Sequence, residues 1–395
     1  MKILIINDSY EEGGGVATYI HATLPYLKKE HEVYLFGFSD NPIKEKNKFL
    51  IKNPRGFKRI LNRFFFNFNA YYSLKDYIKE INPDIIHIHN NYFCSNSILK
   101  ALKDSNTRIL QTVHDYGVIC PTSWCVIKNN LKKCEGSEGI GFKCTKNRCL
   151  NLYHFLLTYT RNRLRFKLSR ELINLFICPS KELKNYYECY GFRKIIYLPH
   201  FIEFGDIKPK KDRIKGPIIY IGVLTRNKGV EYLIKSIKLI KEKLPDIKLN
   251  IIGEGSEKEY LKKLSKELNI EDNINFLGKI PHSNVVKEME KGSILVIPSV
   301  WMENSPFVVY EALAASMPIV GSNRGGIPDL VRDNINGLVA EPANLNDLAN
   351  KIIKILTNKK IYNKFSNNSK KIAEKEFNIK DHIEKLNLVY KYLVK

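Results

Sequence analysis

The sequence lacks the features that mark several classes of protein. No stretch approaches the about 20 consecutive apolar residues of a membrane-spanning helix. The opening run MKILIINDS is too short for a signal peptide, and no small-residue cleavage site follows it. No tandem repeat or low-complexity tract is present. We therefore expect a globular, cytoplasmic protein whose first residues form a buried strand.

Acidic residues are scarce relative to basic ones. There are 41 Asp and Glu against 64 Lys and Arg, which gives a formal net charge of +23. Such an excess suits nucleic acid, an anionic membrane surface or anionic small substrates. A general abundance of Lys, Ile and Asn accounts for part of it. No known nucleic-acid-binding module is present, so we expect no nucleic-acid partner.

The chain has eight cysteines but no C-x-x-C pair. With no export signal, we expect reduced thiols or metal ligands rather than disulfides. Five cysteines lie in the polar insert 120–149, which is too polar to form a core. Two interpretations stay open: free thiols, or a structural zinc ion that orders the insert through Cys120, Cys134, Cys144 and Cys149.

Short, continuous apolar runs alternate with helical patterns along the 395 residues. This alternation predicts an α/β fold with parallel, doubly wound sheets whose strands are buried on both faces. A length near 400 residues favours two domains. The runs that predict strands cover 2–8, 33–38, 85–89, 108–115, 217–223, 248–255, 274–278, 294–299 and 318–322.

The strand pattern restarts after a polar, proline-flanked segment at 209–217. We therefore predict two Rossmann-like domains, at 1–200 and 217–379, joined by a linker at 201–216. A carboxyl-terminal helix at 380–395 is expected to cross back to the first domain. Since ligands bind at the carboxyl ends of parallel strands, the predicted active site lies in a cleft between the two domains.

The segment from Ser299 to Glu311 carries the strongest signal. It follows the predicted strand ILVIP, and Ser305 with Pro306 resembles a helix start, with Ser as the cap. The free amides of such a start attract phosphate. A carboxylate beside a phosphate site repels the phosphate, so its presence there suggests another task. Binding of sugar hydroxyls is such a task, because a carboxylate is a strong acceptor for OH donors. Glu303 and Glu311 are therefore candidate sugar-binding residues.

This segment resembles the donor signature of glycosyltransferase family 4, which consists of retaining enzymes with the GT-B fold. Its hallmark is two Glu separated by seven residues, as Glu303 and Glu311 are. The resemblance implies that Glu303 contacts the transferred sugar and Glu311 the ribose. Asn304, Ser305 and Pro306 then lie beside the donor, and the amides of Phe307 and Val308 hold the diphosphate. The stretch 321–342 also resembles the family, with Asp329 where Glu is commoner.

Two cations follow the first strand of the second domain. Arg226 and Lys228 lie in the loop of YIGVLTRNKGVEYLI, where they would neutralise a diphosphate leaving group. Lys228 resembles the family's Lys. Val223 stands where the family's Arg is expected, so Arg226 is the candidate replacement. The glycines Gly222 and Gly253 are expected to lie near the nucleotide.

The first domain is expected to contribute Gly14, Gly15 and His114. The glycines open a helical pattern after the first strand, which allows close approach of a phosphate. A G-x-G-x-x-G fingerprint is absent, so an NAD enzyme is unsupported. His114 ends the strand RILQTVHD, and the resemblance implies that it contacts the donor sugar.

Two segments, 55–79 and 159–172, mix basic residues with aromatics. Such segments suit an anionic bilayer surface. The alternative is a pair of helices packed on the first sheet, with aromatics inward and Arg outward. The first interpretation would place the protein peripherally on the inner face of the cell membrane.

Together these features predict a hexosyltransferase of polysaccharide or glycolipid biosynthesis. It would move a hexose from UDP or GDP to a glycan or lipid-linked acceptor, with retention and without a catalytic metal or other cofactor. The alternatives are a nucleotide-sugar epimerase of the same fold and a catalytically silent nucleotide-sugar-binding scaffold.

Overall fold

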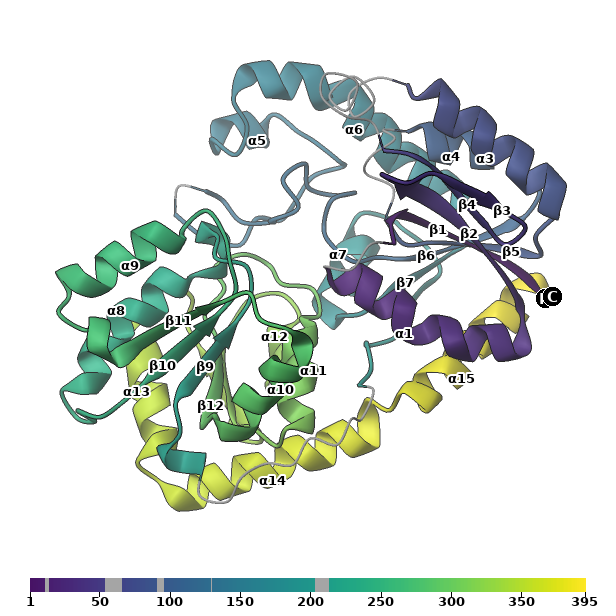
Figure 1. Cartoon of the computed structure of the whole chain (residues 1–395). Helices are drawn as coiled ribbons and strands as arrows, with labels where there is room; N and C mark the ends of the chain where they lie inside the picture. The colour runs from purple at the N-terminus through teal and green to yellow at the C-terminus, as the bar shows by residue number, and fades with distance from the viewer. Residues whose placement is uncertain (11–13, 54–65, 91–95, 129, 203–212) are drawn as a thin grey trace. The chain divides into compact units, whose positions relative to one another are not determined.

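The computed structural model describes the chain except for residues 11–13, 54–65, 91–95, 129 and 203–212. The chain divides into two compact units (Figure 1). The first comprises Met1–His200 together with Ile379–Lys395, and the second comprises Phe201–Asn378. Each unit is described by itself below.

The first unit is built on an eight-stranded sheet with the order β3-β4-β2-β1-β5-β6-β7-β8. All its neighbouring strands are parallel except β3, which pairs antiparallel with β4. The strands are β1 (Lys2–Ser9), β2 (Glu32–Ser39), β3 (Ile43–Glu45), β4 (Lys48–Lys52), β5 (Ile85–Ile88), β6 (Arg108–Thr112), β7 (Leu175–Cys178) and β8 (Ile195–Tyr197).

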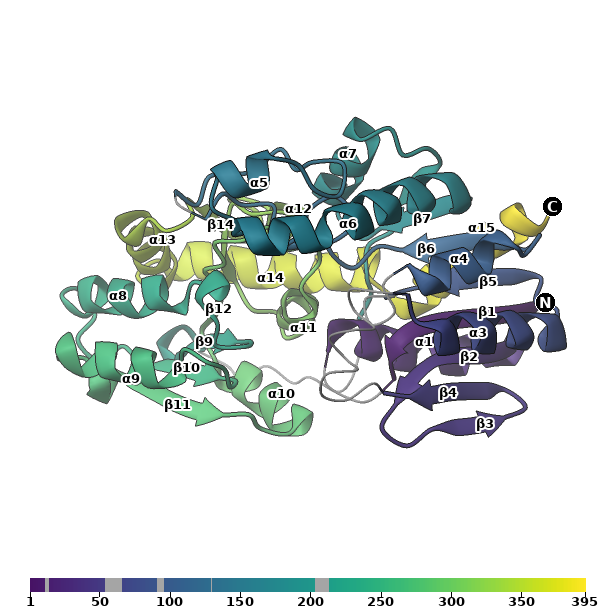
Figure 2. The ribbon, with the colours of Figure 1, turned by 90° about the horizontal axis from the view of Figure 1, so that it is seen from above.

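Helices cover both faces of this sheet. α3, α4 and α6 lie on one face, while α1 and α15 pack together on the other (Figures 1 and 2). The helices described in this unit are α1 (Gly15–Glu30), α3 (Phe68–Ile81), α4 (Ser97–Lys103), α5 (Lys143–Lys146), α6 (Leu152–Leu172), α7 (Lys181–Cys189) and α15 (Ile379–Val394).

The second unit has a six-stranded, fully parallel sheet with the order β11-β10-β9-β12-β13-β14. Its helices are α8 (Val230–Lys241), α9 (Lys258–Glu267), α10 (His282–Lys291), α11 (Phe307–Ala314), α12 (Ile327–Leu330), α13 (Leu345–Leu356) and α14 (Lys359–Glu376). Three short 3-10 turns are η1 (Arg213–Lys215), η2 (Arg226–Lys228) and η3 (Glu271–Asn273). The strands are β9 (Ile218–Ile221), β10 (Leu249–Ile252), β11 (Ile274–Gly278), β12 (Ile294–Ile297), β13 (Ile319–Ser322) and β14 (Gly337–Ala340).

The central strands of the second sheet are buried on both faces. In β9, Ile218 and Tyr220 join the core on one side of the sheet, and Ile219 joins the core on the other side. A strand covered on both sides has no need of polar alternation, which explains its continuous apolar sequence. The predicted fold class, with two Rossmann-like parallel-sheet units, is confirmed. Among the described residues, no helix combines the length and apolarity needed to cross a bilayer.

Candidate nucleotide-sugar site

A part-buried ion pair lies at the carboxyl ends of β9 and β12 in the second unit. Nζ of Lys228 is 2.7 Å from Oε1 of Glu303, and the hydroxyl of Ser299 donates to the same oxygen at 2.6 Å. Lys228 also lies over the ring of Trp301, 4.7 Å from its centroid. The structure thus brings together two residues that the sequence predicted for the site.

The surroundings of Glu303 keep its side chain ionised. Burial alone would raise its pKa, but the charge of Lys228 and the hydrogen bonds to the carboxylate outweigh burial and lower the pKa. The side chain of Glu303 is 8% exposed, and that of Lys228 is 24% exposed. The buried carboxylate of Glu303 would be left without its counter-charge if Lys228 were lost, whereas the part-exposed ammonium of Lys228 could still reach water.

Two glycines allow the loops around this pair to pack closely. A Cβ on Gly229, which has φ +69°, would lie 2.0 Å from the carbonyl oxygen of Pro298. A Cβ on Gly325, which has φ +56°, would lie 1.8 Å from the carbonyl oxygen of Glu303. The amide of Gly326 donates to that same oxygen at 2.8 Å. The loop before α12 therefore fixes the backbone of Glu303.

Helix α11 begins one residue later than the sequence predicted. Pro306 is its N-cap, and no side chain caps the helix start. The predicted cap by Ser305 is wrong, because its hydroxyl is hydrogen-bonded to the hydroxyl of Tyr310 at 2.7 Å. Ser305 and Asn304 are both buried, at 9% and 8% exposure. The start of α11, with no acidic residue in its first turn, still presents backbone amides of the kind that bind anions.

Glu311 has a partner that the sequence did not reveal. Nε2 of His282, the first residue of α10, is 2.9 Å from Oε1 of Glu311. The hydrogen bond from His282 to Glu311 raises the pKa of His282, although burial opposes that shift. An exposed histidine after a proline gives no sequence signal, and only the packing of α10 beside α11 brings it here.

The loop after β9 points its residues in different directions. Lys228 turns inward to Glu303, whereas Arg226 is exposed and Val223 is 55% exposed. Gly222 and Gly253 serve backbone packing, since a Cβ on Gly253 would lie 1.9 Å from the carbonyl oxygen of Gly222. Within the described ranges of the chain, no ion-pair partner is found for Arg226, so it stays a candidate for phosphate binding.

In the first unit, Gly14 is the N-cap of α1 and Gly15 is its first residue. No side chain caps this helix, and its first turn has no acidic residue. A Cβ on Gly14 would have nothing within 4 Å. Among the described residues nothing crowds Gly14, and phosphate binding at this helix start stays a prediction.

His114 is half-buried and packs against buried imidazoles at the carboxyl ends of β5 and β6. Its Nε2 is 2.9 Å from Nδ1 of His89, and its ring stacks on His200 with centroids 5.7 Å apart. The hydroxyl of Tyr19 bonds to Nε2 of His382 on α15 at 2.8 Å. Sequence reasoning found only His114, because the other members come from four separate segments.

Burial keeps this cluster neutral. It lowers the pKa of His114 and of His87 to about 3, and that of His382 to about 4. It also lowers the pKa values of His89 and His200 well below the usual value. In the bond between His89 and His114, one nitrogen must donate and the other accept, so each ring constrains the tautomer of the other.

The five cysteines of the insert form no disulfide, as the sequence predicted. An antiparallel bridge between Val126 and Lys133 places Cys125 beside Cys134, whose amide donates to the Cys125 carbonyl at 2.8 Å. The hydrogen bond from the Cys125 thiol lowers the pKa of Cys120 to about 6, against the effect of burial. In the part of the chain that is described, no three His, Cys, Asp or Glu side chains are arranged to hold a metal ion. The structural zinc stays a prediction that metal analysis of the purified chain would check.

Comparison with known proteins follows the same division into two halves. The profile of group 1 glycosyl transferases matches residues 204–372, and the profile of Glycosyltransferase Family 4 matches residues 13–204. An uncharacterized glycosyltransferase of Methanocaldococcus jannaschii is 26% identical over 95% of this chain and 94% of its own length. One of Haemophilus influenzae is 37% identical over 42% of this chain, a match that spans only 46% of that relative.

Solved structures support the fold. HepE of Anabaena in complex with UDP has a TM-score of 0.75 at 18% identity, with 100% of both chains covered. Sucrose-phosphate synthase of Thermosynechococcus elongatus also has a TM-score of 0.75 at 18% identity, and 99% of this chain is covered. These likenesses confirm the GT-B type of fold. With both halves matched, the chain belongs to glycosyltransferase family 4, the group 1 glycosyltransferases.

Proposed function

We propose that the protein moves a hexose from a UDP- or GDP-linked donor to a glycan or lipid-linked acceptor, with retention of configuration. The observation that carries this proposal is the Lys228–Glu303 ion pair, with its buried carboxylate, at the carboxyl ends of β9 and β12. Glu303 lies on the loop that leads into the uncapped start of α11. Anion-binding amides and a sugar-binding carboxylate thus lie a few residues apart in one segment.

Each part of the donor has a proposed partner in the second unit. The diphosphate binds the amides of Phe307 and Val308, where the helix dipole favours negative charge. The ribose hydroxyls bind Glu311, which exchanges its contact with His282 for the nucleotide. Glu303 receives hydroxyls of the hexose, because its carboxylate keeps acceptor capacity beyond the bonds to Lys228 and Ser299.

Lys228 and Arg226 neutralise the charge that develops on the leaving diphosphate, so protein cations take the role of a divalent ion. In the first unit, the open start of α1 at Gly14 and Gly15 and the imidazole of His114 are proposed to complete the donor site. His114 acts as a neutral hydrogen-bonding group, since burial holds its pKa at about 3.

The reaction proceeds by front-face attack. The bond between the anomeric carbon and the diphosphate oxygen breaks, and the acceptor hydroxyl oxygen bonds to the same face of that carbon. The leaving diphosphate oxygen takes the acceptor's proton. A double displacement would need two carboxyl groups about 5–5.5 Å apart. Glu303 is instead engaged by Lys228, which suits a binding role.

The solved neighbours support the donor class. The Anabaena protein HepE was solved with UDP and with UDP-glucose. UDP and UDP-glucose are the ligands of HepE, and for this chain the same base and sugar are only proposed. For the acceptor class, the support comes from the resemblance to the family.

Two other activities compete with transfer, namely epimerisation of a nucleotide sugar and binding without turnover. Product analysis separates them once a donor is found. A transferase releases nucleotide diphosphate and glycosylates an acceptor, an epimerase produces free or nucleotide-linked epimer without acceptor, and a scaffold leaves the donor intact.

A thermal-shift screen across UDP-, GDP- and ADP-sugars tests the proposal. At about 100 times its Kd, a ligand that binds only the folded state stabilises it by about 2.7 kcal/mol, which raises Tm by several degrees. We expect one nucleotide series to do so, with the shift lost in Glu311→Ala and Lys228→Ala. If no nucleotide sugar raises Tm, the proposal is wrong.

A further inference from the structure

Tyr19 lies at the centre of the histidine cluster in the first unit. It belongs to α1, four residues after Gly15, and is 1% exposed. Its ring packs against four imidazoles, whose centroids lie between 5.2 and 5.8 Å from its own. These imidazoles belong to His89, His114, His200 and His382. One buried side chain therefore joins histidines from four separate segments of the chain.

The hydroxyl of Tyr19 donates a hydrogen bond to His382. Nδ1 of His382 is 2.9 Å from the carbonyl oxygen of Pro199, which can only accept, so Nδ1 carries the proton. Burial lowers the pKa of His382 to about 4, so its ring is neutral near pH 7 and Nε2 is an acceptor. The Tyr19 hydroxyl is 2.8 Å from Nε2 and is therefore the donor.

This hydrogen bond anchors Tyr19 where the chain leaves the first unit and where it returns. The first segment of the unit ends at His200, and the second begins at Ile379. His382 lies in the first turn of the returning helix α15. Its bond to the Pro199 carbonyl joins the two segments, so Tyr19 is held by a part of the unit that is itself tied together.

His114 is the member of the cluster that a ligand can reach. It is half-buried, whereas His89 and His200 are 3% and 4% exposed. The bond from His89 fixes one nitrogen of the His114 ring, but the ring can still tilt about that bond. The rings of His200 and Tyr19 pack against His114 at interplanar angles of 21° and 67°, which restricts the tilt.

A position in the core explains the burial of the Tyr19 ring but not its hydroxyl. Phe would fill the same space without a buried polar group that needs a partner. The hydroxyl instead has a defined acceptor, whose tautomer is set by the backbone. Such a chain of hydrogen bonds suits a ring that has to keep one position.

We propose that Tyr19 is a positioning residue for sugar transfer and acts through His114. Its ring holds the imidazole of His114 in the orientation that meets the donor sugar, and its bond to His382 keeps Tyr19 in place. This role rests on the function proposed above, in which His114 contacts that sugar. Loosening Tyr19 should therefore slow turnover more than it weakens donor binding, because orientation matters most in the transition state.

NMR of the full chain labelled with ¹⁵N-histidine tests the positioning without any donor. The ¹⁵N shifts of each imidazole report its tautomer, and His114→Gln identifies the signals of His114. We expect His382 to carry its proton on Nδ1. In Tyr19→Phe the signals of His114 should shift or broaden, although the hydroxyl that is removed bonds to His382.

Steady-state kinetics with the donor that the thermal-shift screen identifies test the consequence. Tyr19→Phe should lower kcat roughly fivefold and leave KM within about twofold. His382→Leu should have the same effect, whereas His382→Gln should keep most of the activity, because its Oε1 can accept from the Tyr19 hydroxyl. Tyr19→Phe combined with His382→Leu should lose no more than either alone, since both remove the same bond.

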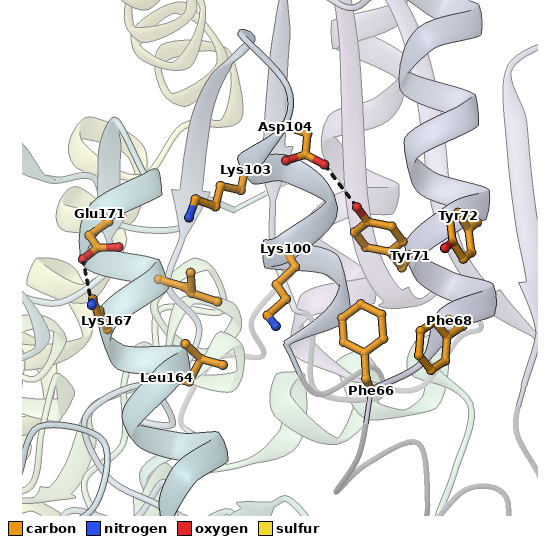
Figure 3. A pocket seen from close by; sticks show the side chains of 11 residues that line it. Phe66, Phe68, Tyr71, Tyr72, Lys100, Lys103, Asp104, Leu164, Lys167 and Glu171 are labelled. Atoms are coloured by element: carbon orange, nitrogen blue, oxygen red, sulfur yellow. Dashed lines mark hydrogen bonds and ion pairs between the residues drawn. The ribbon is translucent and has the colours of Figure 1, made fainter.

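Tyr71→Phe is the matched control in the same unit. Tyr71 lies on α3, on the other face of the sheet, and lines a pocket of about 540 Å³ between α3, α4 and α6 (Figure 3). Its hydroxyl also donates to a side chain, Oδ2 of Asp104, at 3.1 Å. Both substitutions remove one hydrogen-bonded hydroxyl and keep the ring, but only Tyr19→Phe should change the His114 signals and kcat.

Three results would overturn the proposal. The first is a set of His114 signals that is identical in Tyr19→Phe and in the unaltered chain. The second is an unchanged kcat in Tyr19→Phe, and the third is an equal loss of kcat in Tyr71→Phe. If no nucleotide sugar binds, the function proposed above fails, and the spectra still decide whether Tyr19 positions His114.

Discussion

At the scale of single residues, the Lys228–Glu303 pair holds opposite charges where water has little access. Replacing Lys228 with Met leaves the buried carboxylate of Glu303 without its counter-charge, which should cost about 1–3 kcal/mol of unfolding free energy. Adding Glu303→Gln should recover part of this loss, because the double variant buries no charge. Urea unfolding measures it, with Trp301 fluorescence as the probe in a Trp124→Phe background.

The double-mutant cycle makes this prediction quantitative. Residues in direct contact show interaction energies of about 0.5–3 kcal/mol, whereas independent sites add. If the two single losses simply sum to the loss of the double variant, Lys228 and Glu303 do not interact as the structure shows.

His89 is a positioning residue in our account, since it acts through His114. His89→Ala should lower kcat with the identified donor by roughly tenfold, because the imidazole of His114 loses its hydrogen-bonded orientation. His89→Asn should recover much of the activity, since its amide can replace Nδ1. Steady-state kinetics of the two variants decide the point. Equal losses in both would reduce His89 to a packing role.

The residues that sequence reasoning recovered are those that follow strands in a recognisable segment. Glu303 and Lys228 each lie in a local pattern of strand, loop and helix start. Their side chains, a carboxylate and an ammonium group, indicate which part of a nucleotide sugar each could bind. His282 and His89 could not be predicted in the same way. Each owes its position to the packing of separate elements, which bring it to Glu311 and His114.

At the scale of elements, tight turns hold the site in place, and Gly325 is the clearest case. Gly325→Ala would force a Cβ to within 1.8 Å of the Glu303 carbonyl, at φ +56°. We expect a loss of about 1–3 kcal/mol in stability and weaker donor binding, because the backbone of Glu303 must shift. Thermal unfolding with and without donor measures both effects.

Gly14→Ala is the matched control for that change. Gly14 has an extended backbone, with φ −177°, and open space where a Cβ would lie. In Gly14→Ala, the free energy of unfolding should change by less than about 0.5 kcal/mol. The affinity for the donor should fall, because a phosphate is proposed to approach this glycine. Equal stability of Gly325→Ala and the unaltered chain would contradict the role given to the Gly325 turn.

Strands were more predictable than helix starts. Continuous apolar runs such as 218–221 and 294–297 became central parallel strands, because burial on both faces demands apolar residues throughout. The capping of α11 by Ser305 was wrong, since Tyr310 offered its hydroxyl a partner from one turn later. The strand pair β3–β4 went unpredicted, because β3 is a short, charged edge strand and β4 buries only Leu50 and Ile51.

At the scale of the whole molecule, the buried histidines make stability dependent on pH. His87, His114 and His382 have pKa values lowered to about 3, 3 and 4, against about 6.5 in an unfolded chain. At pH values between the folded and the unfolded pKa values, the unfolded state binds more protons than the folded state. The free energy of unfolding therefore falls as pH falls below about 6.5. The slope is about 1.4 kcal/mol per pH unit for each histidine that stays neutral.

His282 titrates with the opposite sign. Its raised pKa gives stability that is present below about 6.5 and is lost as pH rises through the raised value. The single His282–Glu311 pair cannot offset the several buried histidines of the first unit. We therefore expect the free energy of unfolding to decrease clearly from pH 7 to pH 5. Urea midpoints across this range check it. Midpoints that do not change would contradict the neutral, buried state of the cluster.

The most direct test of the account is the stereochemistry of sugar transfer, followed by NMR of the anomeric proton with the donor that the thermal-shift screen identifies. We predict a product with the same anomeric configuration as the donor. Glu303→Gln should abolish turnover, while Glu376→Gln, which changes an exposed carboxylate paired with Arg332, should leave it intact. An inverted product, or full activity in Glu303→Gln, would contradict the account.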